Sequence, residues 1–142
     1  MTANTIKKKS VSISFFSYSK YLLLLMKPRV MSLVIFTCAV GLLTAPVSVS
    51  FLNSIIAILF VTMGAGAAGA LNMWYEADLD KLMTRTCLRP IPTGKVNREH
   101  ALLFGTVLSI VSVVGLYHFS NLTSAILLSI TIAFYVFVYT IW

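Results

Sequence analysis

The chain has 142 residues, of which 58% are hydrophobic and only 11% charged, and its mean hydropathy is +0.92. Soluble domains carry roughly 25% charged residues, so this composition excludes an ordinary soluble protein and predicts an all-α, polytopic membrane helical bundle. The net charge of +7 does not indicate nucleic acid binding, because the basic residues flank hydrophobic segments, as they do at the surface of a lipid bilayer.

The first 20 residues are polar and rich in Ser and Lys. They lack the short apolar core and the small-residue cleavage site of a signal peptide. We therefore expect residues 1–20 to be a basic, disordered leader that is retained, and residues 21–142 to be the membrane domain. A cleaved transit peptide is the alternative, although the leader contains no Arg.

Four apolar segments follow the leader, and about 20 apolar residues suffice for each crossing. The expected transmembrane helices cover residues 30–45 (with a possible extension through 21–26), 51–71, 101–119 and 124–142. Four crossings place all eleven Lys and Arg on one side, with the leader and the polar loop at about 72–100. The positive-inside rule makes this side cytoplasmic in a cell inner membrane, or the matrix side of a mitochondrial inner membrane.

The string Gly64-Ala65-Gly66-Ala67-Ala68-Gly69 has the spacing of the GxGxxG dinucleotide-binding motif. That motif needs a strand before it and a helix that opens at it, whereas this string lies inside an apolar helix. Small residues let transmembrane helices approach closely, so the string predicts helix packing. It also leaves room for a bulky apolar ligand.

Three of the four acidic residues, Glu76, Asp78 and Asp80, lie within five positions directly after this helix. Asn72, Glu76 and Asp80 are spaced i, i+4, i+8 and would share one face of a helix. Oxygen ligands of this kind suit Mg²⁺, which is commonly shared with the phosphates of a substrate. A solvated helix end is the alternative, but acidic residues beside a membrane span are costly and usually functional.

Basic residues follow the acidic cluster on a loop that Pro90 and Pro92 keep from being helical. Arg85, Arg89 and Lys95 could bind phosphate, or they could be the ordinary positive charge of a cytoplasmic loop. The neighbouring acidic cluster favours phosphate. Lys27 and Arg29 enter the first helix from the same side, either as topology anchors or facing the same phosphate.

The acidic cluster resembles the NxxxDxxxD motif of the intramembrane aromatic prenyltransferases. The longer string NMWYEADLDKLMTRTCLRPIPTGK, with KPRVMSL at 27–33 and FYVFVYT at 134–140, is similar to the branch of that family that farnesylates haem. The resemblance covers about residues 21–142. It implies the first half of a helical bundle of about nine helices around a lipid-accessible cavity.

The resemblance also implies the chemistry. The substrates would be farnesyl diphosphate and haem B, the cofactor Mg²⁺, and the product haem O. By position, Asn72, Glu76 and Asp80 would form the Mg²⁺–diphosphate motif with Asp78 beside them. The diphosphate partners would be Arg85 and Arg89 and, less directly, Lys27 and Arg29.

Two departures from the family pattern matter. Glu76 stands where the family usually has Asp, which changes the geometry of a site for an ion that tolerates little change. Family members are also about twice as long and carry a second Asp-rich motif in the later half. We therefore expect a C-terminal half-chain, or haem A synthase, as a protein partner. The alternatives are a non-catalytic remnant or scaffold subunit of terminal oxidase assembly and, more weakly, a transporter fragment.

Overall fold

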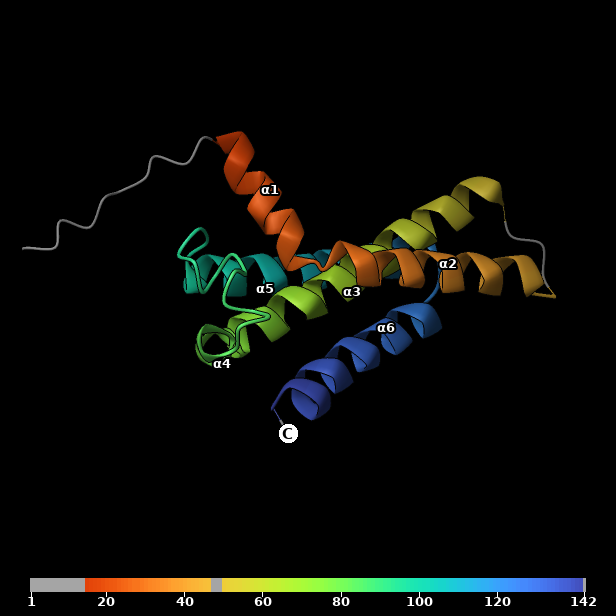
Figure 1. Cartoon of the computed structure of the whole chain (residues 1–142). Helices are drawn as coiled ribbons and strands as arrows, with labels where there is room; N and C mark the ends of the chain where they lie inside the picture. Colours follow the sequence, from red (N-terminus) through yellow and green to blue (C-terminus); the bar gives the residue numbers. More distant parts are fainter. Residues whose placement is uncertain (1–14, 47–49, 142) are drawn as a thin grey trace, which may run out of the picture.

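A computed structural model describes residues 15–46 and 50–141, in which every regular element is a helix (Figure 1). The helices are α1 (Phe15–Leu25), α2 (Pro28–Thr44), α3 (Phe51–Tyr75), α4 (Ala77–Leu82), α5 (Arg98–Phe119) and α6 (Leu122–Phe134), which continues as the π-helix η1 (Tyr135–Ile141). The all-α prediction is confirmed for this part of the chain.

Three stretches are long and apolar enough to cross a membrane: α3, α5, and α6 together with most of η1. The bent pair α1–α2 makes a fourth if it counts as one span. Large apolar side chains cover the outside of these helices, as expected for contact with lipid. The chain is thus a multi-pass membrane protein, and about four crossings were predicted.

The first predicted helix is divided in two by an elbow at Lys27, where α1 and α2 meet at 61°. Lys27 adopts a left-handed backbone conformation (φ 54°, ψ 70°) and Pro28 opens α2. Proline has no N–H to donate and disfavours a helical residue before it, so one continuous helix cannot form here. Residues 15–20, predicted as part of a disordered leader, belong to α1, and residues 1–14 lie outside the described part.

Helix α3 is the centre of the bundle, since α1, α2, α5, α6 and η1 all pack against it. The glycine-rich string lies inside α3, as the packing interpretation predicts. The backbone carbonyl oxygen of Leu25 lies 3.4 Å from where a Cβ of Gly69 would be. On α5, a Cβ at Gly105 would lie 2.8 Å from Leu71 Cγ. Missing side chains thus allow the elbow and α5 to approach α3 closely.

The loop predicted at about residues 72–100 is shorter than expected. Helix α3 runs on to Tyr75, α4 covers residues 77–82 and α5 begins at Arg98, so residues 83–97 form the loop. Gly94 adopts φ 72° in a turn in which its N–H donates to Ile91 O. This loop folds back toward the end of α3 and brings one of its basic side chains, Arg89, to the acidic cluster.

Candidate functional site

Five polar side chains meet where α3 ends, and all five were predicted from the sequence as site residues. They are Lys27 at the elbow, Asn72 in the last turn of α3, Glu76 between α3 and α4, Asp80 in α4 and Arg89 in the loop. We call this group the polar cluster. It has two linked parts, one around Asp80 and one around Asn72.

The first part is an ion pair in which Asp80 is almost completely buried, with 3% of its surface exposed. Arg89 Nη1 lies 2.8 Å from each carboxylate oxygen of Asp80 and 3.6 Å from Glu76 Oε2. A buried carboxylate is costly unless it is paired, and this guanidinium supplies the pairing. Both carboxylates therefore converge on a single positively charged atom.

The second part is a chain of hydrogen bonds through Asn72, which is 1% exposed. The ammonium Nζ of Lys27 donates to Asn72 Oδ1 at 2.5 Å, and Asn72 Nδ2 donates to Thr140 Oγ1 at 3.2 Å. Sequence reasoning missed Thr140. Its only signal was its place in the FYVFVYT string, which carried no information about contacts.

The expected single helix face is wrong in detail, because α3 ends at Tyr75 and α4 starts at Ala77. The four-residue spacing of Asn72, Glu76 and Asp80 still keeps them close across the break. Helix-type hydrogen bonds continue there, because Glu76 N–H donates to Asn72 O and Asp80 N–H donates to Glu76 O. Asn72 thereby turns toward the elbow and Asp80 toward the loop. The three predicted ligands end in one cluster, in which Asn72 faces Lys27 and the two carboxylates share Arg89.

Asp78, Arg85 and Arg29 lie outside the polar cluster. Asp78 is exposed and accepts from Lys81 Nζ at 3.0 Å and Arg98 Nη1 at 2.9 Å. These bonds, led by the one from Lys81, hold the pKa of Asp78 below its ordinary value. Arg29 and Arg85 are exposed and form no ion pair with any other described residue.

The donor chemistry of the cluster fits Mg²⁺ shared with an anionic ligand. Within the described residues, no three His, Cys, Asp or Glu side chains lie close enough together to hold a metal by themselves. Glu76 and Asp80 do converge on one cationic position, now taken by Arg89 Nη1. Mg²⁺ commonly uses one or two carboxylates and completes its shell with water and substrate phosphate.

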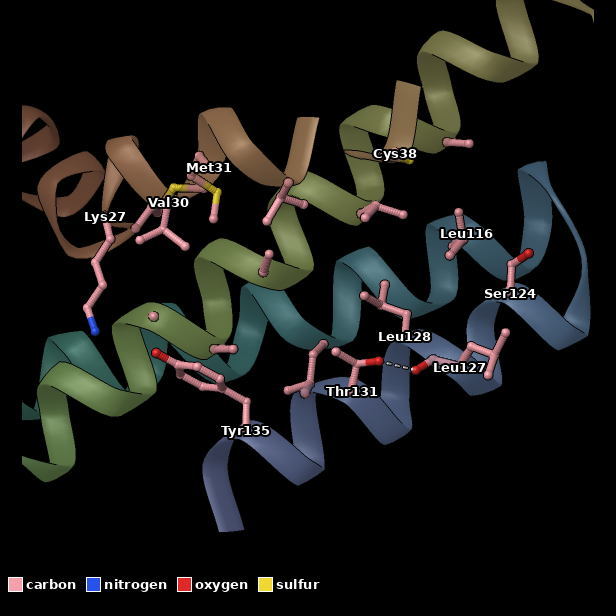
Figure 2. Close-up of a pocket in the computed structure, with 18 of the residues that line it drawn as sticks. Lys27, Val30, Met31, Cys38, Leu116, Ser124, Leu127, Leu128, Thr131 and Tyr135 are labelled. Atoms are coloured by element: carbon pink, nitrogen blue, oxygen red, sulfur yellow. Dashed lines mark hydrogen bonds between the residues drawn. The ribbon is translucent and has the colours of Figure 1, made fainter. Parts of the chain in front are cut away.

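An apolar cavity of about 520 Å³ begins beside the polar cluster and runs along α3 between α2 and α6 (Figure 2). Its wall is mostly aliphatic, with Lys27 and Tyr135 at one end, and includes Val30, Met31, Val61, Leu116, Leu128 and Ile132. This volume falls in the range of roughly 300–1,000 Å³ that small-molecule sites occupy. The cavity suits a long apolar group whose charged end lies at Lys27.

The fold and the site define a multi-pass membrane protein with an apolar cavity that ends at a charged cluster. Residues 33–142 match the UbiA prenyltransferase family, and the chain belongs to this family.

The chain is 64% identical to a protoheme IX farnesyltransferase of Pelagibacter ubique, over 100% of this chain and 47% of the relative. It is 57% identical to protoheme IX farnesyltransferase 2 of Mesorhizobium japonicum, over 83% of this chain and 38% of the relative. The chain thus spans about half the length of the relatives that it matches, or less. No solved structure matches the chain.

Proposed function

We propose that this chain binds farnesyl diphosphate and takes part in transferring the farnesyl group to a vinyl group of haem B, which yields haem O. The observation that carries the proposal is the position of Lys27, which belongs both to the polar cluster and to the wall of the apolar cavity. The relatives named protoheme IX farnesyltransferase support the choice of substrates.

In this proposal the farnesyl chain lies in the cavity along α3 and the diphosphate lies at Lys27 and Arg89. Both side chains are cations held in place by hydrogen bonds, so they are oriented before the ligand arrives. Charge-assisted hydrogen bonds to phosphate oxygens are roughly twice as strong as neutral ones. A bound Mg²⁺ would be held by Glu76 and Asp80, with Asn72 beside them, and would neutralise diphosphate charge. It would take the position of Arg89 Nη1 between the two carboxylates, which would free the guanidinium for the diphosphate.

The reaction breaks the bond between farnesyl C1 and the diphosphate oxygen, and the electron pair leaves with the diphosphate. Lys27 and Arg89 stabilise the charge that accumulates on this leaving group. The vinyl group of haem B then attacks C1. Water supplies a hydroxyl to the other vinyl carbon and a proton is released. The aliphatic wall keeps water from the farnesyl cation until the vinyl group has reacted.

The charge distribution supports a cytoplasmic position for the polar cluster and for the N-terminus, in a cell inner membrane. Helix α4 carries Lys81 and the α4–α5 loop carries Arg85, Arg89 and Lys95, whereas residues 120–123 at the opposite ends of α5 and α6 carry no basic residue. Cytoplasmic loops have such an excess of Lys and Arg.

The experiment that tests this function is a haem analysis of membranes after expression of the chain. The chain is produced alone and together with the remaining part of the Pelagibacter ubique relative, the part beyond the match. We expect haem O with the pair and none when Asp80→Ala replaces the wild-type chain. Undiminished haem O in that variant would overturn the site. Absence of haem O from both preparations would favour a non-catalytic remnant or scaffold subunit.

A further inference from the structure

We propose that Thr140 is a positioning residue that sets the orientation of the Asn72 amide, and through it the position of the Lys27 ammonium at the mouth of the cavity. The inference deepens the proposed function and rests on it where diphosphate binding is concerned. The three residues lie far apart in the sequence, in η1, in α3 and at the elbow between α1 and α2.

The chemistry of the groups fixes the direction of the three hydrogen bonds that link Lys27, Asn72, Thr140 and the Tyr135 carbonyl. An ammonium group has no acceptor, so Lys27 Nζ must donate and the oxygen of the Asn72 amide must face it. The NH₂ group of Asn72 then points to Thr140 Oγ1 at 3.2 Å. The Thr140 hydroxyl donates onward to Tyr135 O at 3.0 Å, which leaves its lone pair for Asn72. Only one orientation of the amide satisfies all three bonds.

The π-helix explains why Thr140 can do this. Threonine hydroxyls inside α-helices bond to the carbonyl three or four residues before, as Thr62 does with Ile58 O and Thr131 with Leu127 O. Thr140 instead bonds to the carbonyl five residues before, in the wider turn of η1. π-Helical turns are rare, and those that occur are frequent at functional sites. Here the wider turn presents the Thr140 hydroxyl to α3.

Burial makes the orientation of Asn72 sensitive to Thr140. Asn72 is 1% exposed and Thr140 is 9% exposed, so water cannot replace the lost partner. Without the hydroxyl, the NH₂ group of Asn72 has a buried, unpaired donor, and the side chain rotates to relieve it. That rotation removes Oδ1 from Lys27. The ammonium group then loses the contact that holds it at the cavity wall.

The side-chain amides of Asn report on this orientation directly. The sequence holds five Asn and no Gln, so a ¹⁵N spectrum of the chain in detergent has five side-chain NH₂ pairs. We expect the Asn72 pair to exchange its protons slowly with water in the wild type and in Thr140→Ser. In Thr140→Val it should exchange at least about tenfold faster. Thr62→Val, which removes a hydroxyl bonded only within its own helix, should leave the Asn72 pair unchanged.

Binding of farnesyl diphosphate to the wild type, Thr140→Ser, Thr140→Val and Thr62→Val tests whether Thr140 affects ligand binding. We expect an affinity about three- to tenfold weaker for Thr140→Val, the size of one lost hydrogen bond, with wild-type affinity for Thr140→Ser and Thr62→Val. Wild-type exchange of the Asn72 pair in Thr140→Val would overturn the positioning role. Fast exchange of the Asn72 protons in Thr140→Val, together with wild-type affinity for farnesyl diphosphate, would overturn the link between Thr140 and the ligand. If the wild-type chain does not bind farnesyl diphosphate at all, the proposed function fails, and proton exchange still decides the role of Thr140.

Discussion

Arg89 Nη1 donates to both carboxylate oxygens of Asp80 at 2.8 Å, and this contact joins the α4–α5 loop to α4, the short helix that follows the central helix. The carboxylate is almost fully buried, whereas Arg89 is about one-quarter exposed. The guanidinium therefore serves two purposes. It neutralises a charge that lies away from water, and it ties the loop to α4.

Replacement of Arg89 by Met should destabilise the protein by about 2 to 3 kcal/mol, because it leaves Asp80 buried and unpaired. The free energy of unfolding in detergent measures this loss. Arg85→Met is the matched control, since Arg85 is exposed and makes no ion pair with the described residues. It should change stability by less than about 0.5 kcal/mol. Adding Asp80→Asn to Arg89→Met should restore part of the loss, and failure to do so would argue against the pair.

The architecture followed from the sequence to a large extent, because apolar segments of about 20 residues and one-sided positive charge leave few arrangements open. The elbow at Lys27 was missed. The sequence contains Pro28, but whether a proline merely opens a helix or also bends the chain by 61° depends on what the preceding helix packs against. Here α1 packs against α3 and α5, which the sequence does not reveal.

Asp78, which lies outside the polar cluster, should contribute to stability in a pH-dependent manner. Its bonds to Lys81 and Arg98 hold its folded pKa below the unfolded value. The contribution is therefore complete above the unfolded pKa and disappears as the pH falls through the folded pKa. Asp78→Asn should lower the melting temperature slightly at pH 7 and by less near pH 2. High salt should reduce the difference, because the pair is exposed. A difference that persists at both pH values would contradict this explanation.

Gly105 should be required for the packing of α5 on α3, whereas Gly41 should not be required for the packing of α2. A Cβ at Gly105 would lie 2.8 Å from Leu71 Cγ and 3.4 Å from Ala67 O, whereas a Cβ at Gly41 meets nothing within 4 Å. Gly105→Val should therefore cost about 1 to 3 kcal/mol of unfolding free energy through overpacking. Gly41→Ala should gain up to about 1 kcal/mol from helix propensity. Equal effects of the two substitutions would contradict the packing described.

The candidate site was only partly predictable, and Asp78 and Thr140 show why. Spacing along the sequence indicates which side chains project from the same face of a helix. It correctly predicted that Asn72, Glu76 and Asp80 lie together, even though the helix breaks at Glu76. It could not show that Asp78 turns away to Lys81 and Arg98. Nor could it show that Thr140, 68 positions after Asn72, reaches the same amide. Contacts between elements depend on packing, which periodicity does not encode.

The measurement that tests the central claim most directly is calorimetric titration of farnesyl diphosphate, with and without Mg²⁺. The protein is the chain in lipid nanodiscs, co-expressed with the remaining part of the Pelagibacter ubique relative. We predict Mg²⁺-dependent binding that weakens by about tenfold or more in Lys27→Ala and in Asp80→Ala, because each substitution removes a charged group from the cluster. Farnesol, which has the same apolar chain without the diphosphate, should show no dependence on Mg²⁺ or on these residues. Wild-type affinity in both variants, or binding that ignores Mg²⁺, would contradict the proposal that the polar cluster is the diphosphate site.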